Sequence, residues 1–348
     1  MNVAFILFFL ILGILLPVPI KCFLNFSRLT EAFYSVVYYD KVKCKYEECC
    51  DANYVDTDVE MLDQMLRKDL FGQHIAHQTV VNALRGHVKS PNPPKALSMS
   101  FHGMPGTGKT FVAQTIAKSF FRNGIRSKFY HFFNGRNDFP LEENLQEYKD
   151  ELSKTIVDSL HQCETSVFVF DEVDKMPKGL LNALIPFLDY NTWHRSWRYS
   201  NNELITKNKA IYIFLSNTGS TQVVRQLISL WEQGKQREAT KLQDFENLIA
   251  LGAFNEKGGF HHSEAIESSA IDHYVPFLPL EVGHVKQCLK RAFRDRSVKP
   301  SEEMIEEAMS HVTFGPPPHD LYSNAGCKRI EQKVASIIYS NRRKAKEL

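Results

Sequence analysis

Residues 103–110 read GMPGTGKT, the most informative segment of the chain. Its spacing is that of a phosphate-binding loop. Glycines let the backbone wrap a phosphate with its N–H groups pointing inward, at the start of a helix whose dipole favours anions. Lys109 would reach the terminal phosphates, and the Thr110 hydroxyl would ligate Mg²⁺. The residues predicted to bind ATP are Gly103, Met104, Pro105, Gly106, Thr107, Gly108, Lys109 and Thr110.

Strand and helix patterns alternate around this loop. Apolar residues at helical spacing predict helices, and short apolar runs predict buried strands. The predicted helices are 56–70, 74–88, 109–121 and 141–160, the predicted strands are 97–102, 128–133, 167–170 and 210–215, and the chain from 280 onward looks helical. Buried strands separated by helices indicate an α/β fold with a parallel sheet sandwiched by helices.

A second element with chemical meaning is VFVFDE at 167–172. An apolar strand that ends in an acid would bring Asp171 to the same sheet edge as the phosphate loop, as a second Mg²⁺ contact. Glu172 would then orient and deprotonate the attacking water. Asp171 is therefore predicted to bind the nucleotide and the metal, and Glu172 to be catalytic.

The third element is Asn217, which follows the strand predicted at 210–215. A polar side chain there can hold the same water or the γ-phosphate, although an Asn after a strand is often only a turn residue. Phosphate loop, acid-tipped strand and polar-tipped strand, in this order, predict an AAA+ P-loop ATPase with a small C-terminal helical domain.

The chain past residue 40 resembles the torsins, AAA+ proteins of the endoplasmic reticulum lumen and nuclear envelope that are related to Clp-type unfoldases. The resemblance lies in LFGQHIAHQTVVNALRGHV (70–88), FVFDEVDKM (168–176), LIPFLDY (184–190), IFLSN (213–217), IDHYVPFLPLE (271–281) and GCK (326–328), with a cysteine cluster at 44–50. It implies a chaperone-like ATPase that remodels protein complexes and assembles as a homo- or hetero-oligomer.

The resemblance also implies roles for single residues. Lys328 would be a second nucleotide sensor, and Cys327 beside it would pair with Cys288 in a redox-sensitive disulfide. Residues 70–73 would lie near the adenine. From the sequence alone, the partners of these two cysteines cannot be deduced.

Two residues and one segment can be compared with other torsins and with Clp-type proteins. Thr110 is the conventional Mg²⁺ ligand, where some torsins have Asn. Ala270 stands where Clp-type proteins have an arginine that acts on the neighbouring subunit's nucleotide. A missing arginine finger costs about 10³–10⁵ in rate, so weak turnover of the chain alone is expected. The resemblance to torsins implies that a membrane-anchored luminal activator supplies the arginine. Residues 134–140 lack the aromatic-Gly loop of a threading pore.

The N-terminus predicts entry into the secretory pathway. Val3 to Leu16 is an uncharged run, too short for a spanning helix and typical of a signal-peptide core. A signal peptide at 1–22 is expected, with an uncleaved anchor and a buried helix as the alternatives. Asn25 lies in the sequon Asn-Phe-Ser and is a predicted glycosylation site. In an oxidising lumen, pairs among the seven cysteines could be disulfides, or they could be idle thiols.

The remaining expectations concern domains and partners. After the signal peptide, the predicted parts are an N-terminal lead-in (23–54), a large nucleotide-binding domain (55–279) and a small helical domain (280–348). The lead-in could touch a membrane surface. No basic stripe interleaved with aromatics is present, which disfavours nucleic acid as a partner. The alternatives to the luminal ATPase are a nucleotide-gated binding module with incidental hydrolysis, and a cytosolic ATPase with a fortuitously apolar N-terminus.

Overall fold

The computed structural model describes residues 44, 46–190, 206–261, 263 and 269–347. The chain divides into two compact units, residues 1–49 and 50–348. The predicted signal peptide, Asn25 and most of the predicted lead-in lie outside the described residues. In the part of the chain that is described, no helix is both long and apolar enough to cross a membrane.

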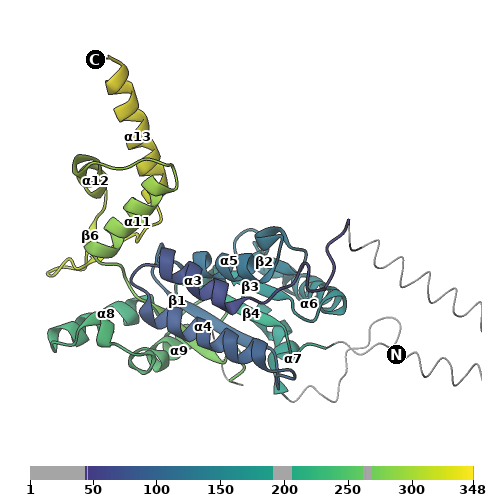
Figure 1. Ribbon diagram of the computed structural model, residues 1–348. Helices are drawn as coiled ribbons and strands as arrows, with labels where there is room; N and C mark the ends of the chain where they lie inside the picture. Colours follow the sequence, from purple (N-terminus) through teal and green to yellow (C-terminus); the bar gives the residue numbers. More distant parts are fainter. Residues whose placement is uncertain (1–43, 45, 191–205, 262, 264–268, 348) are drawn as a thin grey trace, which may run out of the picture. The chain divides into compact units, whose positions relative to one another are not determined.

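A five-stranded parallel sheet forms the centre of the second unit (Figure 1). Its strand order is β2-β3-β4-β1-β5, so β1, which leads into the phosphate loop, lies between β4 and β5. The strands are β1 (Leu97–Gly103), β2 (Tyr130–Asn134), β3 (Val167–Asp171), β4 (Ile211–Ser216) and β5 (His273–Phe277). The predicted parallel sheet is confirmed, and its carboxyl ends meet at one edge.

Helices cover both faces of this sheet, because successive side chains of a strand point to opposite faces. Val167 and Val169 pack in one apolar cluster with the helices α3, α4 and α5, whereas Phe168 and Phe170 pack in another with α6 and α7. The helices are α3 (Val59–Asp69), α4 (His74–Lys89), α5 (Lys109–Phe120), α6 (Leu145–Gln162), α7 (Ile185–Leu188), α8 (Ser220–Glu232) and α9 (Glu246–Asn255). Short 3₁₀ turns lie at Gly124–Arg126, Glu142–Asn144, Val173–Lys175, Leu180–Leu184, Arg237–Ala239 and Leu242–Asp244.

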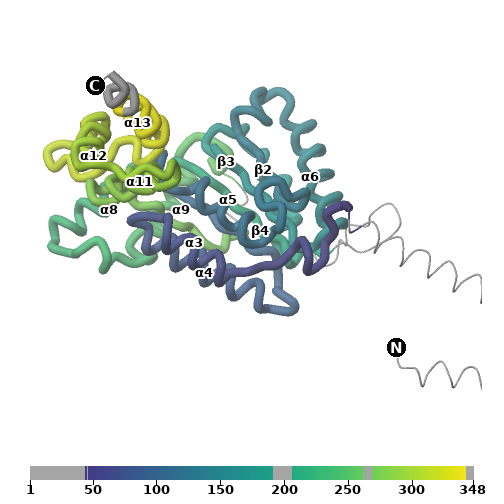
Figure 2. Tube along the Cα trace, turned by 45° about the horizontal axis from the view of Figure 1, so that its top comes forward, coloured from purple at the N-terminus to yellow at the C-terminus, as the bar shows by residue number. Residues whose placement is uncertain are grey.

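A separate apolar cluster holds the C-terminal helices together. Figure 2 shows these helices grouped at one end of the chain. These helices are α11 (Val282–Arg294), α12 (Glu302–Met309) and α13 (Ile330–Glu347). The expectation that everything after residue 280 is helical is wrong at one place. A two-stranded hairpin, β6 (Phe314–Gly315) with β7 (Tyr322–Ser323), interrupts the helices, because consecutive prolines follow Gly315 and cannot continue a helix.

The strand β5 was not predicted from the sequence. It is short, it contains Pro276, and its first residue is a histidine, so it lacks the apolar run that marks the other strands. It lies at the edge of the sheet, where a proline that cannot donate a ladder hydrogen bond is tolerated.

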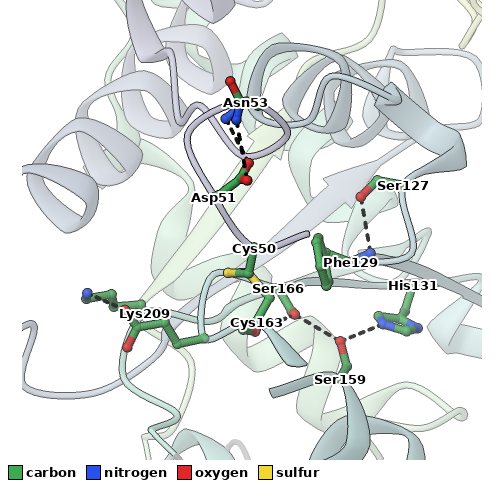
Figure 3. The surroundings of a disulfide bond; sticks show 11 residues. Cys50, Asp51, Asn53, Ser127, Phe129, His131, Ser159, Cys163, Ser166 and Lys209 are labelled. Carbon is green, nitrogen blue, oxygen red and sulfur yellow. Dashed lines mark hydrogen bonds and ion pairs between the residues drawn. A yellow bond between two sulfur atoms is a disulfide. The ribbon is translucent and has the colours of Figure 1, made fainter. Parts of the chain in front are cut away.

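Disulfides join three pairs of cysteines. Cys44 pairs with Cys49, and Cys288 pairs with Cys327 as the resemblance implies. The third, Cys50–Cys163, ties the start of the second unit to the end of α6 (Figure 3). The carbonyl of Cys163 accepts a hydrogen bond from the Ser166 hydroxyl at 2.7 Å, so this end of α6 is fixed to the residue before β3.

The Cys50–Cys163 disulfide should contribute measurably to stability, because the two cysteines are 113 residues apart in the sequence. A crosslink that closes a long loop restricts the unfolded chain, which is worth about 2–5 kcal/mol. We expect the Cys50→Ser, Cys163→Ser double variant to lose about that much free energy of unfolding in urea. The matched control is the Cys44→Ser, Cys49→Ser variant, whose disulfide spans five residues and should cost less. Equal losses in the two variants would contradict the expectation.

Candidate active site

A cavity of about 540 Å³ lies where the strands β1, β3 and β4 end. Its volume is usual for a small-molecule site. The phosphate loop forms one side, and the residues that follow β3 and β4 form another. The end of α3 and residues from the C-terminal helical region complete the wall. The site predicted from the phosphate loop is therefore a real concavity.

The phosphate loop has the backbone that an anion cradle needs. Gly106 and Gly108 have φ values of +77° and +109°, which a residue with a side chain rarely adopts. Gly108 directly precedes α5, a helix of 12 residues, so the loop ends at a helix N-terminus. Of the eight predicted loop residues, Pro105 to Thr110 line the cavity, whereas Gly103 and Met104 do not.

Lys109 is a buried cation, with 8% of its surface exposed. Its Nζ donates to the carbonyl oxygens of Gly103 at 2.6 Å and Met104 at 3.1 Å, and to Asn217 Oδ1 at 3.1 Å. Burial lowers the pKa of Lys109 to about 8, against the opposing effect of Asp171. All three acceptors in contact with the ammonium group are neutral, so it retains its attraction for an added anion.

Thr110 and Asp171 bring oxygen atoms together from two elements. The Thr110 hydroxyl lies 3.4 Å from Asp171 Oδ2, and Asp171 Oδ1 accepts from the backbone N–H of Glu172 at 2.8 Å. Burial raises the pKa of the Asp171 carboxyl, while the Glu172 amide and Lys109 oppose the shift. A hydroxyl and a carboxylate are ligands that Mg²⁺ accepts, so Thr110 and Asp171 would suit a Mg²⁺ ion bound with a nucleotide.

Glu172 lines the cavity and forms an ion pair with Arg136, whose Nε donates to Glu172 Oε2 at 2.7 Å. Glu172 has a φ of +52°, unusual for a residue other than glycine, asparagine or aspartate. The loop that presents Arg136 is fixed to β3, since the amide of Gly135 donates to the Asp171 carbonyl at 2.8 Å. The proposed catalytic carboxylate is therefore engaged by a residue from the neighbouring strand's loop.

Asn217 is held by an acid that the sequence analysis did not single out. Its backbone N–H and its side-chain Nδ2 both donate to Asp174 Oδ1, at 3.2 and 3.3 Å. Its Oδ1 is left to accept from Lys109, so the amide orientation is fixed. The signal in the sequence was the second aspartate of DEVDK, three residues after Asp171.

The GCK stretch of the C-terminal region docks directly onto the phosphate loop. The amide of Cys327 donates to the Gly106 carbonyl at 2.9 Å, and Lys328 lines the cavity with both disulfide cysteines, Cys288 and Cys327. A Cβ atom on Gly106 would overlap the Ala325 carbonyl oxygen. The structure therefore brings Lys328 to the phosphate end of the site, and the redox role of the disulfide stays a prediction.

The residues of the stretch 70–73, predicted to lie near the adenine, occupy two different environments. Leu70 and Phe71 line the cavity. Gln73 is buried behind it, where its Nε2 donates to the carbonyls of Thr107 at 3.1 Å and Leu278 at 2.8 Å. This glutamine ties the phosphate loop to the segment that leads into the C-terminal helices, a function that no sequence pattern indicated.

Taken with the strand order, this geometry defines an AAA+ protein of the P-loop nucleoside triphosphatase class. Two structures of Hsp104 share the fold: the S. cerevisiae Hsp104-ADP complex, with a TM-score of 0.56 and 18% identity, and a closed state with ATPyS and FITC casein, at 0.54 and 15%. The matches cover 86% and 81% of this chain, which spans about half the length of Hsp104, 50% and 47%.

Comparisons of sequence place the chain more narrowly, and it belongs to the torsin family. The family model Torsin matches residues 44–170, and the model for the Torsin-1A C-terminal domain matches residues 280–336. A torsin-like protein of Drosophila melanogaster is 36% identical over 94% of this chain and 96% of its own length. Another, from Caenorhabditis elegans, is 38% identical over 85% of this chain and 82% of its own.

The contact between the phosphate loop and the GCK stretch can be tested by adding one methyl group to Gly106. We expect Gly106→Ala to weaken ADP binding by at least about tenfold, because the new Cβ overlaps the Ala325 carbonyl and φ is positive. Isothermal titration calorimetry would measure the affinity. The matched control is Gly86→Ala in α4, where a Cβ meets nothing within 4 Å and helix propensity favours alanine. Unchanged affinity in Gly106→Ala would contradict this description of the loop.

Proposed function

We propose that this chain is a Mg²⁺-dependent ATPase that remodels protein complexes in the endoplasmic reticulum lumen and nuclear envelope. The observation that carries the catalytic part is the convergence of Lys109, Asp171, Glu172 and Asn217 at one end of a single cavity. These are a cation, a metal ligand, a base and a polar anchor, and phosphoryl transfer depends on positioning such groups.

In this proposal, Thr110 and Asp171 hold Mg²⁺, which neutralises charge on the β- and γ-phosphates when it is bound. Lys109 and Lys328 contact the phosphates from the loop and from the C-terminal region. Glu172 orients the attacking water and takes its proton. Asn217 contacts the same water or the γ-phosphate.

Turnover of the isolated chain is proposed to be weak, because Ala270 offers only a methyl group at the position of the trans-acting arginine. Ala270 is buried, and its carbonyl accepts from Lys95 Nζ at 2.9 Å and from the Ser98 hydroxyl at 2.6 Å. The backbone there is fixed, and alanine carries no charge to stabilise the transition state. We therefore propose that a membrane-anchored luminal partner supplies the arginine.

The proposed remodelling of protein complexes and the proposed cellular location rest on membership of the torsin family. The torsins as a family are associated with the endoplasmic reticulum lumen and nuclear envelope, and the fold is shared with Hsp104. Protein clients, assembly into an oligomer and contact with a membrane surface belong to the same proposal. Glycosylation of Asn25 in cells, detected by endoglycosidase digestion, would test the luminal location, and an unmodified chain would speak against it.

The central experiment measures ATP turnover of residues 44–348, which keep all three disulfides, beside the Glu172→Gln variant, with Mg²⁺ at saturating ATP. We expect both proteins to bind ATP, with wild-type turnover low but above the variant, because Glu172→Gln removes the base and keeps the shape. Adding an arginine-bearing luminal partner should raise only the wild-type rate, by about 10³-fold or more. Wild-type turnover that stays equal to that of Glu172→Gln with the partner present would contradict the ATPase proposal. Brisk turnover without a partner would contradict the argument from Ala270.

A second candidate function, a nucleotide-gated binding module with incidental hydrolysis, is favoured by the ion pair of Glu172 with Arg136. A base held in an ion pair is not free to take a proton from water. If this pair restrains hydrolysis, Arg136→Gln should raise turnover severalfold in the same assay while ADP affinity stays unchanged. Arg122→Gln is a matched surface control, since Arg122 contacts the Tyr54 ring away from the cavity. A fall in turnover would instead assign Arg136 to binding of ATP.

A further inference from the structure

His102 is a fully buried imidazole that directly precedes the phosphate loop. It packs beside the rings of Phe260 and Tyr274, with centroid distances of 6.1 and 6.0 Å. The proposed reaction makes no use of it. A buried imidazole in a central strand must satisfy both ring nitrogens, so its partners indicate what it does.

The two ring nitrogens of His102 have different partners. Nδ1 lies 3.0 Å from the Thr218 carbonyl oxygen, and Nε2 lies 2.6 Å from the Ser100 hydroxyl. A carbonyl can only accept, so Nδ1 carries the proton, and Nε2 accepts from Ser100. Burial lowers the pKa of His102 to about 4, so the ring is neutral near pH 7. His102 is therefore a neutral donor with its N–H aimed at Thr218.

The position of Thr218 makes this hydrogen bond matter for the site. Thr218 follows Asn217, and its backbone N–H donates to the Ser216 hydroxyl at 3.1 Å. Asp174 fixes the backbone N–H and the side-chain amide of Asn217. Three successive peptide groups are thus fixed: the one before Asn217 by Asp174, the one after it by the Ser216 hydroxyl, and the one after Thr218 by His102.

We propose that His102 is a positioning residue for Asn217. Its Nδ1–H fixes the Thr218 carbonyl and so sets where the Asn217 amide meets Lys109 and the bound phosphate. This inference rests on the proposed ATPase function, because its effect is on turnover. The strand β1 would then have two roles. It leads into the phosphate loop that ends at Lys109, and its His102 orients Asn217, the polar residue that follows β4.

A double-mutant cycle distinguishes positioning from a merely structural role, because residues that act through one another have non-additive effects. We expect His102→Leu to lower turnover about tenfold and Asn217→Ala to lower it at least as much. In the Asn217→Ala background, His102→Leu should change turnover less than about twofold. Affinity for ADP should change less than about twofold in every variant, since Asn217 is proposed to act at the γ-phosphate.

A conservative variant provides the rescue. In His102→Asn, the amide nitrogen occupies a position close to that of Nδ1 and can donate to the Thr218 carbonyl, whereas leucine cannot. We expect His102→Asn to recover most of the turnover that His102→Leu loses. If His102→Leu does not fold, His102→Gln replaces it in the cycle, because its longer amide reaches the position of Nε2 near Ser100 and leaves no donor at the position of Nδ1.

Three results would overturn the inference: rate effects of His102→Leu and Asn217→Ala that multiply, unchanged turnover in His102→Leu, or no recovery in His102→Asn. A failure of the proposed function is separate, because it would leave wild-type turnover no higher than that of Glu172→Gln. With wild-type turnover above that background, multiplying effects overturn only the role of His102.

Discussion

The site depends on keeping a charged lysine out of water without giving it a carboxylate to contact. Burying an ammonium group is expensive unless hydrogen bonds replace its hydration. Lys109 has three such bonds, to Gly103, Met104 and Asn217, and all three acceptors are neutral. The positive charge is therefore held in place before any nucleotide arrives, and its pKa of about 8 keeps it mostly protonated at neutral pH. Two of the three acceptors lie in the phosphate loop and the third is Asn217 at the end of β4, so both segments have to keep their positions for Lys109 to keep these hydrogen bonds.

The C-terminal helices take part in the same arrangement because their GCK stretch is built onto the phosphate loop. The carbonyl of Gly106 accepts from the amide of Cys327, which is itself linked to Cys288 in α11. A shift of these helices would therefore move Gly106 of the phosphate loop as well as Lys328. Gln73 adds a buried link between the loop and the segment at Leu278. The loop is in this sense shared by two parts of the fold.

Local patterns predicted most of the fold and the site, because each of these features is encoded in a few consecutive residues. The loop glycines, the acids after β3 and the polar end of β4 each follow an apolar strand that the sequence shows directly. The strand β5 and the pairing of Cys50 with Cys163 could not be predicted, since they depend on contacts between distant segments. The same holds for Arg136 with Glu172 and for His102 with Thr218. Such pairs are set by the register of neighbouring strands, which a single sequence does not display.

Charge balance supports the proposal that this site binds ATP but needs a partner to hydrolyse it quickly. Among the described residues that line the cavity, the cationic side chains are Lys109, Arg136, Arg291 and Lys328. The carboxylates are Asp69, Asp171, Glu172 and Glu331, so the wall is close to neutral before a nucleotide enters.

ATP brings more negative charge than one Mg²⁺ ion neutralises, and further charge moves onto the transferring phosphoryl group in the transition state. Backbone N–H groups and the N-terminus of α5 can stabilise the bound phosphates. They are already engaged in the ground state, however, and an interaction that is equal in both states does not accelerate the reaction. Of the four cations, Arg136 is paired with Glu172 and Arg291 with Asp69. Ala270 adds no charge, which supports the proposal that another molecule supplies the arginine for hydrolysis.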